Sequence, residues 1–361
     1  MKKKGFLIIL ASCAVVAVVI MLSLNFYSNR KISYYTKNEA FSNQWGLYNC
    51  GQEIEGQKGT RGVDIDIIKA WDFTKGSPEV IVGILDSGVE LDCVEIKDSI
   101  YCNPKESING KDDDNNSFID DKNGWNFFSD NNMVYDDYLH DYHGTYLASI
   151  IASSHDSGKV FGIAPNVKVL PLKFMHGARG NTKDSIQAID YAYSFGVRII
   201  NCSWDSTVYD EDLKKAMEKY QDVLFVCSAG KSKNNLESLP VYPACYDLPN
   251  VISVVAVDNR GELEEFSGYG ASADVAAPGV GIYGAMPDGG YIFSGGTSTA
   301  TACVTGIAAL IQSYYPELSA TQTAQILKDN CKPLDSLKGK VASGGIINAY
   351  MCLKNAAKYV K

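Results

Sequence analysis

Three residue types that together can perform acyl transfer occur at separate points of this 361-residue sequence. Asp86 follows an apolar run, His143 precedes Gly144-Thr145, and Ser298 follows the glycine-rich turn Gly295-Gly296-Thr297. A serine hydroxyl attacks a carbonyl when an imidazole takes its proton and a carboxylate orients the imidazole. Each residue also has a structural interpretation, since Asp forms turns and His and Ser cap helices. Their order and contexts together favour the catalytic interpretation.

The elements that must position these residues follow from the hydrophobic pattern. Apolar, β-branched runs predict strands buried on both faces at residues 80–85, 167–172, 197–202, 223–226 and 251–257. Helical spacing occurs at residues 145–153, 183–195, 210–220 and 300–315. This alternation predicts one α/β domain with a doubly wound, mainly parallel sheet and helices on both faces. Asp86 would follow a strand, His143 would precede a helix, and Ser298 would lie at the start of a buried helix.

These residues carry a family resemblance. The order Asp, His, Ser resembles that of the subtilisin-like serine proteases, the subtilase family. The motifs are Asp86-Ser87-Gly88, His143-Gly144-Thr145 and Gly296-Thr297-Ser298, supported by Gln44-Trp45-Gly46-Leu47, Val241-Tyr242-Pro243-Ala244 and Ala276-Ala277-Pro278-Gly279. The resemblance covers residues 38–359. It implies a subtilisin-like fold and a serine endopeptidase for protein or peptide substrates, in which Ser298 is the nucleophile, His143 the base and acid, and Asp86 the orienting carboxylate.

The sequence departs from the family pattern at the oxyanion hole. The family uses an asparagine amide, following a glycine at the end of a strand, as the second donor to the oxyanion. Here Lys231 follows Gly230 at the matching position. An ammonium group can donate hydrogen bonds, yet its charge disfavours the imidazolium that forms on His143. We therefore expect Lys231 in the oxyanion position, with activity that this lysine weakens. Other departures are Tyr146, Ser149, Ala302 and Cys303.

Two segments resemble the substrate-binding edges of the family. They contain Ser203, Trp204 and Asp205 in one case and Ser228, Ala229 and Gly230 in the other. An extended peptide would add to such edges through backbone hydrogen bonds. Asp205 stands where the family has glycine, so we expect its carboxylate to favour small or basic residues at P1, with a solvated turn residue as the alternative interpretation.

An acidic loop at residues 109–121 has the composition of a cation site. Asp112, Asp114 and Asn116 alternate as the oxygen ligands of calcium loops do, and similar loops occur in some subtilisin-like enzymes. Ser117 stands where such loops have glycine, and a solvated acidic insertion is the alternative. The chemistry itself needs no cofactor, and the sequence allows a structural calcium ion.

The N-terminus predicts a membrane segment. Lys2, Lys3 and Lys4 precede a largely apolar run at residues 6–24, about 28 Å long as a helix and close to a bilayer core of ~30 Å. No Ala-x-Ala cleavage site follows it, so we expect residues 1–30 to be an anchor, with a cleaved signal as the alternative. The lysines place the N-terminus in the cytoplasm and the catalytic domain, residues 31–361, outside the membrane, or secreted if the segment is cleaved.

Composition limits the remaining classes. A net charge of −9, with no basic run beyond the N-terminus, argues against a nucleic-acid partner. Most of the ten cysteines are expected to be reduced thiols, several within apolar runs, with a Cys93–Cys102 pair left open. Two alternatives to a general endopeptidase remain: a catalytically impaired subtilisin-like module that binds peptides or regulates, and a narrow processing enzyme for one exported peptide.

Overall fold

The computed structural model describes residues 30–360. The apolar run at residues 6–24, on which the predicted anchor at residues 1–30 depends, lies outside the described residues. Among the helices of residues 30–360, none has both the length and the apolar character that crossing a bilayer requires.

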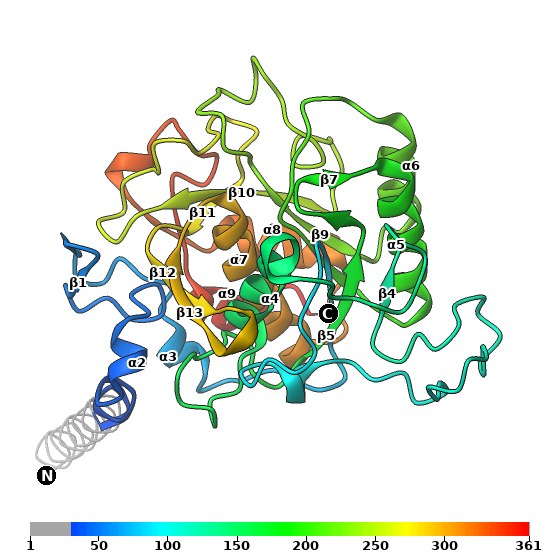
Figure 1. Cartoon of the computed structure of the whole chain (residues 1–361). Coiled ribbons are helices and arrows are strands. Elements are labelled where there is room, and N and C mark those ends of the chain that lie inside the picture. The colour runs from blue at the N-terminus through cyan, green and yellow to red at the C-terminus, as the bar shows by residue number, and fades with distance from the viewer. Residues whose placement is uncertain (1–29, 361) are drawn as a thin grey trace, which may run out of the picture.

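A nine-stranded sheet forms the centre of the described chain (Figure 1). In spatial order its strands are β14 (Cys331–Pro333), β15 (Gly345–Ile347), β11 (Val275–Pro278), β10 (Val251–Val257), β9 (Leu224–Ser228), β8 (Ile199–Cys202), β3 (Ile81–Asp86), β5 (Lys168–Lys173) and β4 (Trp125–Asn126). Every neighbouring pair is parallel except β14 and β15. The five predicted strands match β3, β5, β8, β9 and β10 to within two residues at each end, so the predicted mainly parallel sheet is confirmed.

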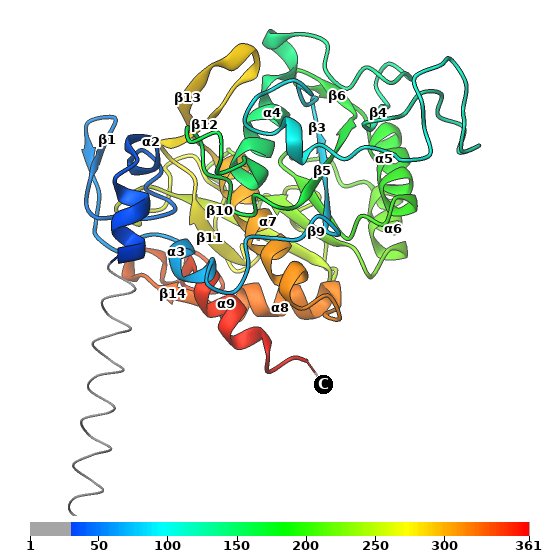
Figure 2. The same ribbon diagram turned by 90° about the horizontal axis from the view of Figure 1, so that it is seen from below.

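Helices cover both faces of this sheet (Figures 1 and 2). On one face, α4 (Tyr138–Ala152) packs against α7 (Thr297–Tyr314), while α5 (Thr182–Ser194) and α6 (Glu211–Lys219) lie on the other. Residues 30–36 are also helical. Other helices are α2 (Glu39–Ser42), α3 (Ile67–Ala70), α8 (Ala320–Asp329), α9 (Ala349–Ala356) and the 3₁₀ turns η1 (Lys97–Ser99), η2 (Pro287–Gly289) and η3 (Asp335–Leu337). Three small hairpins are β1–β2 (Glu53–Ile54, Gln57–Lys58), β6–β7 (Met175–His176, Arg179–Gly180) and β12–β13 (Ile282–Ala285, Tyr291–Ser294).

Helix α4 begins earlier than predicted. Asp137 is its N-cap, and the Asp137 side chain accepts a hydrogen bond from the backbone N–H of His140. The first two turns, which carry exposed Tyr138 and Leu139, lack the apolar spacing of residues 145–153. The prediction that His143 precedes the helix was therefore wrong: His143 lies inside α4.

Helix α7 also begins before its predicted start. Its N-cap is Gly296, whose φ of +132° is costly for residues with a Cβ, and no side chain caps this end. Ser298 is thus the second residue of the helix rather than its cap. The Thr299 and Ala300 N–H groups donate to the Gly296 carbonyl, whereas the first two N–H groups of the helix, those of Thr297 and Ser298, have no acceptor within it.

The family departures in α4 have a structural role. The Tyr146 hydroxyl donates to the Ile282 carbonyl (2.8 Å), and the Ser149 hydroxyl accepts from the Ala285 N–H (2.9 Å). A Cβ at Gly284 would lie 2.6 Å from the Tyr146 ring. These contacts tie α4 to β12, which explains why larger polar residues are accommodated here.

The cysteines of the described residues are unpaired. Cys93 and Cys102 are both free thiols, so they form no disulfide with one another. The other thiols are Cys50, Cys202, Cys227, Cys245, Cys303, Cys331 and Cys352. Burial raises the pKa of Cys303 to about 12, as expected for a thiol that serves as a small apolar side chain.

Candidate active site

Asp86 and His143 meet at the C-terminal edge of the sheet. Asp86 is the last residue of β3 and is fully buried. Its Oδ1 lies 2.8 Å from Nδ1 of His143 and accepts a hydrogen bond of 2.7 Å from the Ser87 N–H. Gly88 and Gly144 permit this approach, because a Cβ at Gly144 would lie 2.2 Å from the Gly88 carbonyl oxygen. A buried carboxylate in this position fixes the orientation and tautomer of the ring.

Ser298 opens onto the same cleft from α7. Its hydroxyl donates to the Ser203 carbonyl oxygen (3.0 Å), and the Ser203 hydroxyl donates back to the Ser298 carbonyl oxygen (3.0 Å). Asn201 donates to Ser203 Oγ, and Thr305 on α7 donates to Asn201. Among the described residues no hydrogen bond joins Ser298 to His143. Strand β8 and helix α7 are thus held in fixed register, with the serine hydroxyl turned toward Ser203.

The cleft has a volume of about 350 Å³. Its lining brings together Asp86, Ser87, Leu139, His140, Tyr142, His143, Met175, Gly177, Ala178, Ser203, Trp204, Asp205, Lys231 and Ser298. Seven of the predicted site residues therefore share one concave surface. The wall at Met175, Gly177 and Ala178 was not predicted, because the β6–β7 hairpin is too short to give a strand pattern.

Ser228, Ala229 and Gly230 lie beneath this surface rather than in its lining. Ser228 Oγ is 2.8 Å from Thr297 Oγ1, and the Ala229 N–H donates to the Val254 carbonyl (3.0 Å). Gly230 has a φ of +79°, which a side chain would strain. This segment fixes the start of α7 and leads the chain into Lys231.

Lys231 extends across the turn before the nucleophile. Its Cε lies 3.0 Å, and its Nζ 3.5 Å, from the point that a Cβ on Gly296 would occupy. The residue is exposed, and within the described chain its ammonium group forms no ion pair. The cation is therefore close to the first turn of α7, where Ser298 lies.

Asp205, which also lines the cleft, lies close to Gly230. Its Oδ2 lies 3.2 Å from the point that a Cβ on Gly230 would occupy, and Val241 Cγ1 lies 3.3 Å from it. Desolvation raises the pKa of Asp205, and the charge of Lys231 partly opposes that shift. The Asp205 carboxylate and the Val241 side chain therefore both occupy the space beside Gly230. Trp204, the adjacent residue, packs against Phe174 with a centroid separation of 5.0 Å.

A buried ion pair that the sequence did not reveal lies behind Asp86. Lys173, the last residue of β5, is fully buried and donates to Asp141 Oδ1 at 2.5 Å. Its ammonium also donates to the carbonyls of Ser87 and Met175. A lysine at the end of an apolar strand gives no sign in sequence of a buried partner from a distant helix.

The acidic loop brings the predicted Asp112 and Asp114 together with Glu106, a residue that was not predicted. One oxygen from each of Glu106, Asp112 and Asp114 lies within 4.8 Å of the others. Glu106 Oε2 and Asp114 Oδ1 are buried and have no hydrogen-bond partner. Asn116 lies beside this cluster: its N–H donates to Asp112 Oδ1 (3.0 Å), its Oδ1 accepts from the Phe118 N–H, and its Nδ2 donates to Asp121. The donor set of hard oxygens fits Ca²⁺, with Glu106 as the residue that the spacing argument missed.

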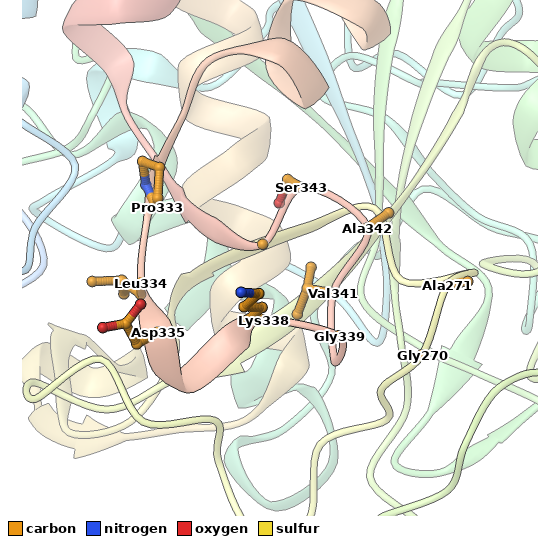
Figure 3. A pocket seen from close by; sticks show the side chains of 11 residues that line it. Gly270, Ala271, Pro333, Leu334, Asp335, Lys338, Gly339, Val341, Ala342 and Ser343 are labelled. Atoms are coloured by element: carbon orange, nitrogen blue, oxygen red, sulfur yellow. The ribbon is translucent and has the colours of Figure 1, made fainter.

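A larger hollow lies away from these residues (Figure 3). It has a volume of about 500 Å³, lies beside η3 and β14, and shares no lining residue with the cleft. Asp335 and Lys338 are the charged residues in its lining, which is otherwise small or apolar. It lacks the convergent polar groups of the cleft, so the smaller cleft is the candidate active site.

Comparisons with known proteins agree with this geometry. A model of the subtilase peptidase family matches residues 77–345. Subtilisin-like protease 1 of Plasmodium berghei is 32% identical over 299 residues, which are 76% of this chain and 49% of that protein. Subtilisin DY of Bacillus licheniformis is 36% identical over 196 residues, which are 53% of this chain and 71% of that protein. This chain therefore spans about half the length of the Plasmodium relative.

Solved structures share the fold. A chain from a structure on subtilase cytotoxin SubAB assembly has a TM-score of 0.66 and 25% identity, with 82% of this chain and 95% of that chain covered. The prenylagaramide maturation protease PagA has a TM-score of 0.63 and 25% identity, with 81% and 98% covered. The chain belongs to the subtilase family of serine peptidases.

Proposed function

We propose that this protein is a serine endopeptidase that hydrolyses peptide bonds through Asp86, His143 and Ser298. The observation that carries the proposal is that a buried carboxylate holds the His143 ring in the cleft that Ser298 enters from the start of a helix. Rotation about the Ser298 Cα–Cβ bond would exchange the Ser203 carbonyl for the imidazole as acceptor. His143 would then take the hydroxyl proton as Oγ attacks, and return it to the leaving amine.

Covalent labelling tests the proposal directly. A fluorophosphonate probe should label the wild-type chain and fail to label Ser298→Ala. Hydrolysis of casein by the wild type should accompany the labelling. Absence of labelling would favour the rival function, a module that holds an extended peptide without cleaving it.

The ammonium group of Lys231 is the proposed second donor to the oxyanion, beside the Ser298 N–H. Its position across Gly296 supports this role, because the substrate carbonyl oxygen that becomes an oxyanion when Ser298 Oγ attacks would lie near that turn. We expect Lys231→Met, which keeps the aliphatic stem, to lower kcat by about 10²–10³-fold with little change in KM. Kinetics on a peptide substrate measure this effect. An unchanged kcat would exclude the role, and a higher kcat in Lys231→Asn would mean that the lysine weakens catalysis.

Asp205 is the proposed determinant of P1 preference. The carboxylate and Val241 crowd the space beside Gly230, so small or basic P1 residues should be preferred. In Asp205→Gly we expect kcat/KM for large apolar P1 residues to rise by at least about 10-fold, measured on a library that varies P1 alone. Asp205→Asn is the matched control: it should lose the basic preference and still reject large residues. A wild type that already prefers large apolar P1 residues contradicts the proposal.

The acidic loop is the proposed binding site of a structural calcium ion. The second oxygens of Glu106 and Asp114 support it, because a buried carboxylate oxygen without a partner is costly, although the other oxygen of each accepts hydrogen bonds. Calcium at about 100 times its Kd should stabilise the chain by about 2.7 kcal/mol, and chelation should reverse this. Thermal unfolding with and without calcium measures the effect. Glu106→Gln should abolish the calcium response, whereas Asp130→Asn, an exposed residue outside the cluster, should retain it; equal responses would remove the site.

The proposed location of the catalytic domain is outside the cytoplasmic membrane. Its support is the sequence at residues 1–24, where lysines precede an apolar run of bilayer length. This location would expose the cleft to exported proteins or peptides, the substrate class that the proposal implies.

A further inference from the structure

The turns of α4 that carry His143 are attached to the rest of the domain by few contacts. Asp141 is the only buried residue among residues 138–143. Leu139 is 77% exposed, and His143 is half-buried beside the cleft. The position of the His143 ring therefore depends on what holds the Asp141 side chain.

Asp141 pairs with a buried ammonium group at the end of a neighbouring strand. Lys173 and Asp86 are partners in the register of β5 and β3, and each is the last residue of its strand. The Lys173 ammonium donates to Asp141 Oδ1 (2.5 Å), and both side chains are fully buried. It also donates to the carbonyl of Ser87 and to that of Met175 (3.1 Å). One ammonium group thus joins α4, the turn after Asp86 and the β6–β7 hairpin.

The backbone beside Asp141 is closely packed. A Cβ at Gly88 would lie 3.3 Å from Asp141 Cβ, and a Cβ at Gly144 would lie 3.4 Å from Asp86 Cβ. Successive residues of an α-helix are rotated by about 100°, so Asp141 and His143 leave α4 on nearly opposite sides. Fixing Asp141 in the interior therefore fixes the direction of His143.

The other contacts of these turns come from a hairpin that the same ammonium group holds. The Gly177 N–H donates to the His140 carbonyl (3.2 Å), and the rings of His140 and His176 stack with centroids 4.1 Å apart. Both contacts belong to the β6–β7 hairpin, whose Met175 carbonyl accepts from Lys173. Lys173 thus holds α4 directly through Asp141 and indirectly through the hairpin.

The neighbouring charged groups do not replace Asp141 as the partner of Lys173. Asp136 Oδ2 lies 3.5 Å from Lys173 Nζ, but its side chain is 29% exposed. The Asp136 N–H donates to Asp141 Oδ2 (2.6 Å), and His176 Nδ1 lies 3.7 Å from Asp141 Oδ1. The fully buried pair is therefore Lys173 with Asp141.

We propose that Lys173 and Asp141 are positioning residues that hold the His143 imidazole against Asp86, an inference that rests on the proposed protease function. Replacing a buried ion pair by apolar side chains of similar volume is often neutral or stabilising, so stability alone does not account for the pair. Hydrogen bonds between charged groups are directional, whereas apolar packing is not. Without the pair α4 should shift, and a displacement of about 1 Å lowers a rate by as much as about 10²-fold.

The double variant Lys173→Met/Asp141→Leu separates positioning from folding. Its kcat for a chromogenic peptide should be about 10²-fold below that of the wild type, with KM changed by less than about 2-fold. Asp141→Asn, which keeps the side-chain shape and removes the charge, should lower kcat in the same way by about 10-fold. Urea unfolding of each variant in the Ser298→Ala background shows that the chain is folded under the assay conditions.

Lys168→Met is the matched control. Lys168 is the first residue of β5, and its ammonium donates to the Asp98 carbonyl (2.7 Å) in an exposed contact, so kcat should stay at the wild-type value. Wild-type kcat in both folded pair variants would overturn the positioning role. A loss that appears in KM alone would overturn it as well.

Proton NMR gives a readout that needs no peptidase activity. In the Ser298→Ala chain the proton between His143 Nδ1 and Asp86 should give a resonance far downfield, which His143→Ala removes. It should persist in Lys168→Met and be shifted or lost in Asp141→Asn and in the double variant. An unchanged resonance in both pair variants, or none in the parent chain, would contradict the inference. Failure of the proposed function would differ: the wild type would not hydrolyse peptides, while the resonance would still respond to the pair.

Discussion

Ser298→Ala is expected to lower kcat for peptide hydrolysis by about 10⁶-fold, the magnitude that loss of the nucleophile has in subtilisin. The physical reason is that the hydroxyl, the His143 imidazole and the Asp86 carboxylate act as one unit, so removal of the attacking atom forfeits proton transfer as well. Rates for a chromogenic peptide, measured under single-turnover conditions, test the prediction. Residual hydrolysis should come only from substrate binding and the oxyanion donors.

Two further variants separate this loss from misfolding. The double variant Ser298→Ala/His143→Ala should have a kcat no lower than that of either single variant, because the effects of removing residues that act as one unit are not additive. Ser313→Ala removes a hydroxyl from the far turn of the same helix, where it donates to the Ala309 carbonyl, and should keep wild-type kcat. If Ser298→Ala hydrolysed peptides at the wild-type rate, another residue would have to be the nucleophile.

The sequence was sufficient to predict the strands of the sheet and the position of Asp86 at its edge. Strands buried on both faces have a continuous apolar pattern, and the end of β3 places Asp86 without any knowledge of its partner. The start of α4 was misplaced because its first turns face solvent and depend on one cap, Asp137, whose side-chain contact is local and weakly marked in sequence. Strong periodicity locates the middle of a helix better than its ends.

Contacts between segments that are distant in the sequence could not be predicted from it. Glu106 lies outside the alternating pattern of Asp112, Asp114 and Asn116. The folded loop brings it beside the two aspartates, where its Oε1 accepts from the Asp113 N–H. His140 and His176 belong to different elements, and only the fold stacks their rings. The hydroxyl direction of Ser298, toward Ser203, is likewise a rotamer choice that residue types do not fix.

Lys173→Met is expected to lower the free energy of unfolding by about 3–5 kcal/mol. The substitution leaves the Asp141 carboxylate fully buried, with the Asp136 N–H (2.6 Å) as a remaining hydrogen-bond donor. An uncompensated buried charge is much more costly than the pair itself is favourable. Urea unfolding of the variant in the Ser298→Ala background, where self-digestion cannot distort the transition, measures the change.

The double variant Lys173→Met/Asp141→Leu decides whether this cost comes from the unpaired charge. Removing both ions exchanges a desolvated pair for apolar packing, so the double variant should be more stable than Lys173→Met alone. The carbonyls of Ser87 and Met175 lose their Lys173 donor in both variants, so that loss cancels in the comparison. If the double variant were instead as unstable as the sum of the two single variants, then Asp141 and Lys173 would contribute independently. The cost of Lys173→Met would in that case come from packing and the lost carbonyl contacts rather than from the unpaired carboxylate behind Asp86.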